Sequence, residues 1–140
     1  MQFVLDNSVT MRWLFGGGRK DDLAYADRVL QALAGADGAA VVPAIWALEV
    51  GNVVVRAEAQ GLLSEARSAE FLGMLQQMPI EPDTHTAQHA WADTLQLARR
   101  HKLSSYDASY LELALRRGTS IATLDADLRR ASVRAGVAQF

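Results

Sequence analysis

Phe3-Val4-Leu5-Asp6-Asn7, near the start of the chain, is a run of three apolar residues closed by two polar ones. Such a run is typical of a strand that is buried on both faces, as in a parallel sheet. Ligands of these sheets bind at the carboxyl ends of the strands. The position of Asp6 therefore predicts a side chain that faces a ligand site, and the ordinary alternative is a turn or a helix cap.

Outward from this run, the same pattern recurs along the chain. Ala39–Val42, Ile80 and Ser120–Thr123 predict further strands. Between them, apolar residues recur at helical spacing, and we expect helices over residues 8–14, 21–34, 44–60, 64–78, 84–100, 104–118 and 125–136. Short strands alternating with helices predict an α/β fold of three layers, α/β/α, in which helices flank a central parallel sheet. No repeat or linker interrupts the pattern, so we expect residues 1–140 to form a single domain.

The composition is that of a globular protein, since 50% of the 140 residues are hydrophobic and 21% are charged. The 14 Lys and Arg against 16 Asp and Glu give a net charge of −2, which excludes a chain-wide basic surface for nucleic acid. The lack of Cys excludes disulfides, thiolate metal sites and Cys nucleophiles. No apolar run approaches the ~20 residues that cross a membrane, and the first residues lack the apolar core of a signal peptide. We therefore expect a soluble cytoplasmic protein without a membrane partner.

Two further acidic residues stand near strand ends or helix starts. Asp125 follows the last predicted strand, and Asp107 lies three residues after Ser104 in a loose form of the capping-box pattern. A helix-cap role is the ordinary interpretation of both. The functional interpretation is a pair of carboxylates at the ligand-binding edge of the sheet.

Glu49 differs from these acids because it lies in the middle of an apolar helix. With Asn52 and Arg56 it forms a narrow polar stripe at i, i+3 and i+7. This stripe either faces solvent or directs the carboxylate into a cleft. Together, the four acids favour a site for Mg²⁺ or Mn²⁺, because these ions prefer oxygen ligands and no thiolate competes for them.

Basic residues gather in three short clusters, Arg99–Lys102, Arg116-Arg117 and Arg129-Arg130. Each lies near a helix C-terminus or on an exposed face, where a positive charge suits the helix dipole. Binding of a phosphate by at least one of them is the alternative.

The four acids lie in four blocks of sequence. Val4–Ser8 is similar to a strand followed by Asp-x-Ser, and Val42–Asn52 is similar to a Pro…Trp…Glu-Val-x-Asn helix. Leu103–Ala114 resembles a Leu…Asp-Ala-x-Tyr-Leu-Glu-Leu-Ala segment, and Ile121–Leu128 resembles an Ala-Thr-Leu-Asp-x-x-Leu ending. In this order, and spread over nearly the whole chain, the blocks resemble the PIN-domain ribonucleases. More narrowly, they resemble the VapC-like toxins of type II toxin–antitoxin systems.

The resemblance implies a three-layer PIN fold and a divalent-metal-dependent endoribonuclease, which hydrolyses RNA phosphodiester bonds. The catalytic residues and ligands of one or two Mg²⁺ or Mn²⁺ ions are then Asp6, Glu49, Asp107 and Asp125. Thr123 is expected to position a water or an acid through its hydroxyl, and Asn52 to hold Glu49. The resemblance also implies homodimers and inhibition by a small cognate antitoxin protein.

Other classes of protein also place acids at strand ends. A phosphoacceptor module needs a cation after a late strand, and neither Lys20 nor Lys102 stands there. A phosphatase with an aspartyl nucleophile needs Asp-x-Asp after the first strand, where this chain has Asp6-Asn7-Ser8. A catalytically silent binding protein on the same fold remains a further alternative. The RNA that is cleaved, the number of metal ions and the role of Asp127 stay open at this point.

Overall fold

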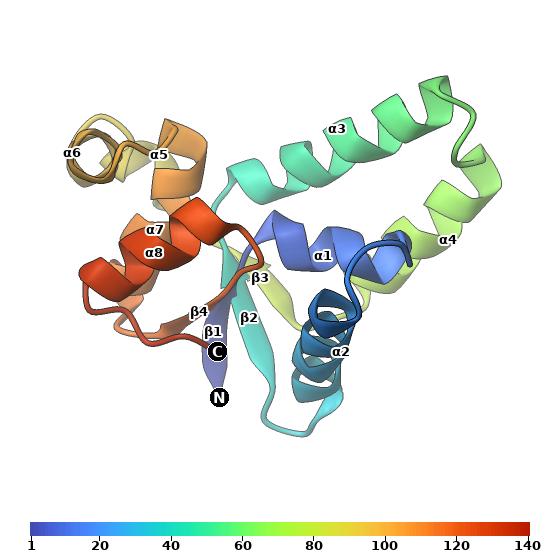
Figure 1. Ribbon diagram of the computed structural model, residues 1–140, viewed down its shortest axis with the longest axis horizontal. Coiled ribbons are helices and arrows are strands. Elements are labelled where there is room, and N and C mark those ends of the chain that lie inside the picture. The colour runs from blue at the N-terminus through green and yellow to red at the C-terminus, as the bar shows by residue number, and fades with distance from the viewer.

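Four short parallel strands form the centre of the molecule. The computed structural model describes residues 1–140. The strands are β1 (Gln2–Leu5), β2 (Ala39–Val42), β3 (Ile80–Pro82) and β4 (Ser120–Ala122). They lie in the order β3-β2-β1-β4, and every neighbouring pair is parallel (Figure 1). The register sets Val4 beside Val41 on one side and beside Ile121 on the other.

Helices cover both faces of this sheet. They are α1 (Asn7–Leu14), α2 (Lys20–Ala34), α3 (Ile45–Ala59), α4 (Glu65–Gln76), α5 (Thr86–His89), α6 (Asp93–His101), α7 (Ser105–Arg117) and α8 (Ala126–Arg134). In Figure 1, α1 and α2 lie on one side of the strands and α7 and α8 on the other, so the predicted α/β/α layers are confirmed. None of the helices has the length and apolar composition that crossing a membrane requires.

The central strands owe their continuous apolar runs to this double cover. Phe3, Val4 and Leu5 are all completely buried, so the three apolar positions of β1 are covered on both faces of the sheet. A strand with one solvated face alternates apolar and polar residues, whereas a strand covered on both faces does not. The apolar run therefore correctly predicted a central strand.

The helix expected over residues 84–100 is wrong as a continuous element. The chain forms α5 and α6 with a turn at residues 90–92, and Trp91 in this turn is 92% exposed. The two parts are fixed by different partners. The Thr86 hydroxyl accepts a hydrogen bond from the Ala44 N–H at 2.9 Å, while Ala98 is buried where α6 packs on α7. A turn between these anchors lets each part meet its own partner.

The helix expected from residue 8 starts one residue earlier, and Ser8 does not cap it. The helix begins at Asn7 with Asp6 in the N-cap position, and Ser8 lies in its first turn. The Ser8 hydroxyl instead donates a hydrogen bond to the Asp6 carboxylate. The helix starts expected at Ser104 and Asp125 are confirmed, since the Ser104 hydroxyl and the Asp125 carboxylate each accept a backbone N–H at the start of their helices.

Candidate functional site

Asp6 lies where the order of the strands reverses. From β1 the chain continues to β2 and β3 on one side, and it returns to β4 on the other side of β1. Open parallel sheets bind their ligands at such a switch point, beyond the carboxyl ends of the strands. Asp6 directly follows β1 and Thr123 directly follows β4, and the Thr123 hydroxyl donates a hydrogen bond of 2.8 Å to Asp6 Oδ2.

Two hydroxyl groups orient the Asp6 carboxylate. Ser8 Oγ donates to Asp6 Oδ2 at 2.6 Å and accepts the Leu124 N–H at 2.9 Å. Thr123 Oγ1 makes the second bond to Oδ2 and accepts the Asp125 N–H at 3.0 Å. Because a backbone N–H occupies an acceptor site of each hydroxyl, the hydroxyl protons point to Oδ2. Neither hydroxyl bonds to Oδ1 of Asp6.

Burial shifts the pKa of Asp6, which is only 5% exposed. Loss of solvent raises the pKa above its ordinary value, and the negative charge of Asp125 raises it further. The hydrogen bonds from Ser8 and Thr123 act in the opposite direction and do not cancel the effect of burial. Asp6 is thus a desolvated carboxylate beside a second acid.

Glu49 reaches the same region from α3. The hydroxyl of Tyr110 donates a hydrogen bond of 2.6 Å to Glu49 Oε1. Tyr110 lies in α7 and is completely buried. Burial raises the pKa of Glu49, and the charges of Asp6 and Asp107 raise it further. The three residues of the polar stripe predicted from the sequence therefore do not face the same surroundings. Glu49 turns inward, while Asn52 and Arg56 are exposed and make no hydrogen bond or ion pair with it.

Asp107 lies in the first turn of α7, and its carboxylate is half-buried. The helix cap is made by Ser104, whose hydroxyl accepts the backbone N–H of Asp107 at 3.1 Å. The Asp107 carboxylate is thus not used for capping. Burial raises the pKa of Asp107 to about 6, with further increases from the charges of Asp125, Asp6 and Asp127.

Asp125 combines both of its predicted roles. Its Oδ1 caps α8 by accepting the Leu128 N–H at 2.9 Å. Its charge also raises the pKa of Asp6 and of Asp107, so it lies close to both of these carboxylates. A cap therefore does not exclude a place in the acidic site.

The four acids thus come together from four parts of the chain: the end of β1, the middle of α3, the start of α7 and the residue after the β4 turn. Asp6, Asp107 and Asp125 each raise the pKa of at least one other acid of the four, and the charges that shift the pKa values of Asp6, Glu49 and Asp107 are all negative. In three of the acids, the hydrogen bonds described above hold one carboxylate oxygen and not the other, which is Oδ1 of Asp6, Oε2 of Glu49 and Oδ2 of Asp125.

The chemistry of this donor set fits a divalent cation. As they stand, no three of the carboxylates are close enough to hold one ion together. However, their shared negative charge lacks a positive partner, and free oxygens are the ligands that Mg²⁺ and Mn²⁺ prefer. Asn7, which directly follows Asp6 in the chain, carries a further oxygen. Asn7 Oδ1 is the one buried side-chain N or O atom without a hydrogen-bond partner, and such atoms often mark the place of a water or an ion.

Sequence reasoning missed both Asn7 and Tyr110. Asn7 carried no signal of its own, because a polar residue after a strand is ordinary in a turn. Tyr110 lies three residues after Asp107, on the same side of α7, and this spacing is a signal that could have linked it to the site.

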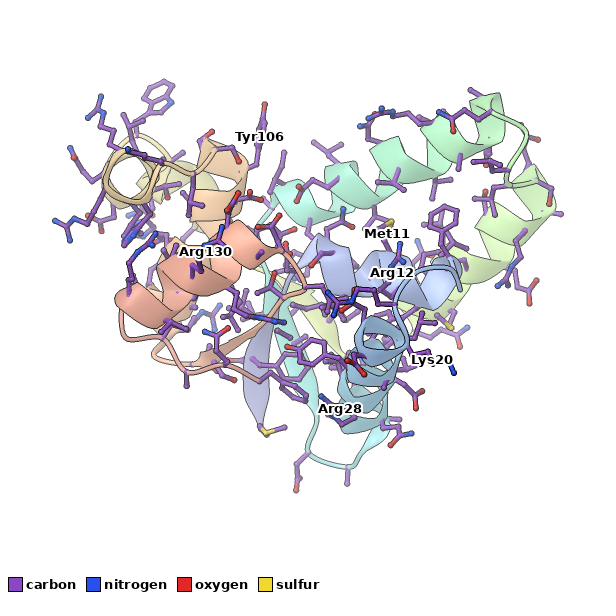
Figure 2. The ribbon with its side chains drawn as sticks, viewed as in Figure 1. Met11, Arg12, Lys20, Arg28, Tyr106 and Arg130 are labelled. Carbon is purple, nitrogen blue, oxygen red and sulfur yellow. The ribbon has the colours of Figure 1, made fainter.

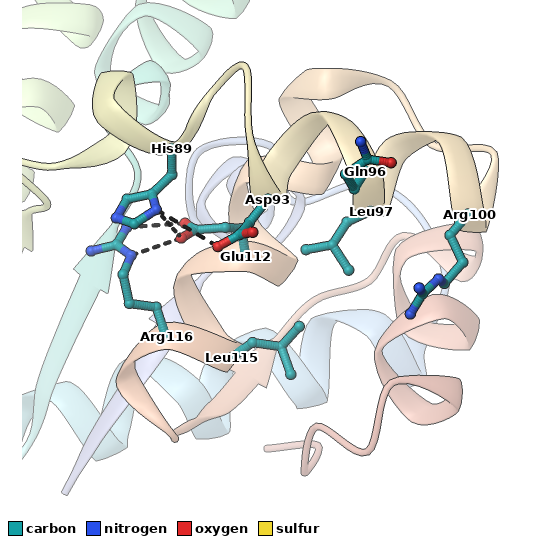
Figure 3. Close-up of a pocket in the computed structure, with 8 residues that line it drawn as sticks. All are labelled: His89, Asp93, Gln96, Leu97, Arg100, Glu112, Leu115 and Arg116. Carbon is teal, nitrogen blue, oxygen red and sulfur yellow. Dashed lines mark hydrogen bonds and ion pairs between the residues drawn. The ribbon is translucent and has the colours of Figure 1, made fainter.

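A second polar network lies on the far side of α7. Arg116 donates to both carboxylate oxygens of the buried Asp83, at 3.0 and 2.7 Å, and to Glu112 at 2.8 Å. His89 Nδ1 lies 3.5 Å from Glu112 at the wall of a pocket of about 460 Å³ (Figure 3). The guanidinium holds the pKa of Asp83 well below its usual range.

This network corrects the interpretation of one basic cluster. Arg116 is engaged by two buried acids and is structural, and Arg117 lies 3.8 Å from the same Asp83. In the third cluster, Arg129 donates to the Thr123 carbonyl at 2.6 Å, and Arg130 pairs with Asp127. None of the ion pairs in the structure involves a residue of Arg99–Lys102.

The family model of the PIN domain matches residues 3–133 of the chain. The chain belongs to the PIN-domain family. The matched residues of this PIN domain include all four acids of the site. No curated protein matches it in sequence.

Two solved structures share the fold of this PIN domain. PAE2754 from Pyrobaculum aerophilum superposes with a TM-score of 0.68 at 18% identity, over 99% of this chain and 83% of the other. FitAcB from Neisseria gonorrhoeae superposes with a TM-score of 0.59 at 21% identity, over 100% of this chain and 96% of the other. At these identities the likeness concerns the fold.

Proposed function

We propose that this PIN domain is a divalent-metal-dependent endoribonuclease. The observation that carries the proposal is the meeting of Asp6, Glu49, Asp107 and Asp125 at the switch point of the sheet, with no positive charge to balance them. PIN domains are generally nucleases, which supports the same reaction. In the proposal, the four carboxylates hold one or more Mg²⁺ or Mn²⁺ ions.

The residues of the chain prepare this site for a phosphodiester. Ser8 and Thr123 fix one oxygen of Asp6, and Tyr110 fixes one oxygen of Glu49, so the second oxygen of each is held ready for a ligand. Such fixed orientations reduce the reorganisation that binding would otherwise require. A divalent cation held there supplies Lewis-acid charge for the phosphate and a more acidic water.

The balance of charge also favours a metal over a direct encounter with RNA. A polyanion is repelled by four carboxylates, and the whole chain carries a net charge of −2. A divalent ion offsets two of these negative charges, and Arg99–Lys102 can add positive charge for phosphate contacts. This account explains how an acidic protein acts on RNA.

We further infer that the protein is the toxin of a toxin–antitoxin pair, and that it forms homodimers and binds a small antitoxin in the cytoplasm. The sequence blocks that resemble VapC-like toxins support this inference. The surface of α3 also supports it, because Leu48 and Val55 are 71% and 58% exposed and Leu62 just beyond the helix is 70% exposed. Exposed apolar patches mark interfaces. Light scattering at micromolar concentration is expected to give the dimer mass, and the monomer mass alone would contradict the homodimer.

The test of the enzymatic proposal is cleavage of a structured RNA pool with Mg²⁺ or Mn²⁺ and with a chelator. We expect cleavage only with the ion, and we expect Asp6→Asn and Asp107→Asn to lose it while they stay folded by circular dichroism. The matched control is Asp37→Asn, which removes one exposed carboxylate far from the site in sequence and is expected to cleave normally. Full cleavage by folded Asp6→Asn, or by the wild type in chelator, would disprove the metal assignment.

A further inference from the structure

A small pocket lies beside Asp107 and outside the acidic site. Its volume is about 170 Å³. It is formed by the start of α7, the start of α3 and the α5–α6 segment, and its walls include Ile45, Ala90, Thr94, Ser105, Tyr106 and Ser109. Ser105 and Tyr106 directly precede Asp107, so the pocket opens next to the place where the proposed function puts the scissile phosphate.

The chemistry of the walls excludes a charged ligand. No residue that lines the pocket carries a charge, although the neighbouring site holds four acids and the nearby networks hold several Arg. A phosphate or a metal ion would find no counter-charge there. The pocket is also smaller than the ~300–1,000 Å³ of typical small-molecule sites. Its size and neutrality suit one planar, uncharged ring system.

Tyr106 offers an aromatic surface at this pocket. It is 60% exposed, and Figure 2 shows it at the start of α7, pointing away from the sheet. Its carbonyl accepts the Ser109 hydroxyl at 2.5 Å, which fixes the turn that presents it. Trp91, next to Ala90 in the pocket wall, is 92% exposed. Exposed aromatic rings at a nucleic-acid site are the usual platform for unstacked bases.

Thr94 adds a polar group inside the pocket. The residue is 2% exposed, and its hydroxyl makes no hydrogen bond within the protein. Asn7 Oδ1 is the only sealed side-chain N or O atom without a partner, so the Thr94 hydroxyl is not sealed and opens into the pocket. A buried hydroxyl in this state is ready to bond to a ligand, because a group left without a partner costs free energy.

We propose that this pocket receives an unpaired nucleobase of the substrate, stacked on Tyr106 and flanking the phosphate at the acidic site. The proposal rests on the proposed action on RNA and narrows the substrate class. A base inside a duplex is stacked and paired and cannot enter, whereas a base in a loop or a single strand can. The pocket at the start of α7 therefore holds the unpaired base next to the cleavage position.

The test is a binding measurement in chelator, so that no cleavage is involved. The probes are hexauridylate, hexaadenylate and a hexameric ribose-phosphate chain that carries no bases, each with a fluorescent end label. We expect the wild type to bind at least one base-containing hexamer about ten-fold or more tighter than the abasic one, since stacking on an aromatic residue contributes ~1–3 kcal/mol per base.

Variants assign this preference to the pocket. Tyr106→Ala removes the aromatic ring, and Ala90→Leu fills the pocket with a larger side chain from another segment. Both variants are expected to bind the base-containing and the abasic hexamers with nearly equal affinity. Tyr106→Phe keeps the ring and is expected to keep the preference. Leu115→Ala is the matched control, because it removes a 42% exposed side chain from the same helix outside the pocket.

The outcomes separate this proposal from the proposed function. Equal or undetectable binding of all hexamers by the wild type, or a full preference in Tyr106→Ala, would overturn the nucleobase pocket even if RNA is cleaved. A preference that disappears in Tyr106→Ala would support the pocket even if the wild type cleaves no RNA, and the absence of cleavage would then count against the nuclease alone.

Discussion

At the scale of single residues, the candidate site is organised by hydroxyl groups more than by its acids. Ser8, Thr123 and Tyr110 each donate to one carboxylate oxygen. The backbone N–H groups of Leu124 and Asp125 donate to the Ser8 and Thr123 hydroxyls, and these bonds set the direction of the two hydroxyl protons. The carboxylates are therefore held in place before any ligand arrives.

The first prediction concerns Thr123, which is completely buried. Thr123→Val removes the bond to Asp6 and leaves the Asp125 N–H without its acceptor. We expect the free energy of unfolding to fall by about 1–3 kcal/mol, the cost of unsatisfied buried polar groups, and RNA cleavage to fall with it. Urea unfolding measures the first effect and an RNA cleavage assay the second.

Thr123→Ser keeps the hydroxyl and is expected to restore cleavage. Ser132→Ala is the control for losing a buried hydroxyl elsewhere, because Ser132 bonds only to the Leu128 carbonyl within α8. It is expected to lower stability without changing cleavage per folded molecule. If Thr123→Val cleaves as well as the wild type once folded, the hydroxyl does not position Asp6 for the reaction.

The second prediction concerns Asn7, whose Oδ1 is buried without a partner. Asn7→Ala removes this unsatisfied acceptor, so we expect the unfolding free energy in chelator to stay the same or to rise by about 1 kcal/mol. We also expect weaker binding of Mn²⁺, because a side-chain oxygen of the residue that follows Asp6 is lost. Thermal melts across a Mn²⁺ titration measure both effects, and a lower stability in chelator would show that Oδ1 has a partner in the protein.

The sequence predicted which acids matter and did not predict what holds them. Asp6 and Asp125 follow apolar runs, and runs of this kind place their last residues at one edge of a parallel sheet. The partner of Glu49 lies 61 residues away in α7. No local pattern encodes that contact, because it depends on how α3 and α7 are placed across the sheet.

At the scale of elements, a buried ion pair joins α7 to the chain that leaves β3. Asp83 follows β3 directly and has no exposed side-chain surface, and Arg116 in the last turn of α7 bonds to both of its oxygens. The spacing of Glu112 and Arg116 at i, i+4 was visible in the sequence. The participation of Asp83, which is 33 residues from Arg116, was not.

The third prediction tests this pair. Arg116→Met leaves Asp83 as a buried charge without its main partner, and we expect a loss of about 3 kcal/mol in unfolding free energy, the lower end for buried pairs because Arg116 is 22% exposed. The low pKa of Asp83 sets the pH dependence. Its contribution is present above the ordinary pKa of an Asp and is lost as pH falls through the lower folded value.

Urea unfolding of the wild type and Arg116→Met between pH 7 and pH 2 checks both effects. The difference between the two proteins is expected to be largest near neutral pH and to shrink in strong acid. The double variant Asp83→Asn with Arg116→Met is the control, and it is expected to recover part of the loss because no charge is left buried. An equal stability of wild type and Arg116→Met at pH 7 would contradict the role given to the pair.

The break between α5 and α6 shows a limit of periodicity at this scale. Residues 84–100 have helical spacing, and the elements on either side of the break are helical. Where a helix is interrupted depends on which parts of it are anchored, and the anchors at Ala44 and on α7 are distant in sequence. The exposed Trp91 is a consequence of this break, and it places an aromatic ring near the pocket beside Asp107.

At the scale of the whole molecule, the strand order explains why four distant acids meet. The reversal between β1 and β4 leaves a site open at the carboxyl edge of the sheet. The residues that follow β1 and β4, and the helices α3 and α7, each bring an acid to this edge. The central strands could be predicted from their apolar runs. Their order could not, because runs of similar composition give no information about which strand pairs with which.

The last prediction follows from the crowding of negative charge. Burial and the charges of its neighbours raise the pKa of Asp107 to about 6 and raise those of Asp6 and Glu49 above their ordinary values. A raised pKa means that the folded state binds more protons than the unfolded state. Without metal, the free energy of unfolding is therefore expected to fall as pH rises from the ordinary pKa of an Asp, about 4, through about 6.

A divalent ion that binds only the folded state reverses this loss at neutral pH. At ten times its Kd, Mn²⁺ adds about 1.4 kcal/mol to the free energy of unfolding, which raises the melting temperature of a chain of this length by about 3–6 °C.

Asp107→Asn removes one of the repelling charges and leaves the Ser104 cap on its backbone N–H intact. We expect this variant to melt higher than the wild type in chelator at pH 7.5 and to respond less to Mn²⁺. Asp37→Asn, with its exposed carboxylate, is expected to behave as the wild type does in both conditions. A wild type that shows no rise with Mn²⁺, together with an Asp107→Asn protein that melts lower in chelator, would mean that Asp107 stabilises its helix as an ordinary first-turn charge. The acids would then lack the mutual repulsion on which the proposed metal site depends.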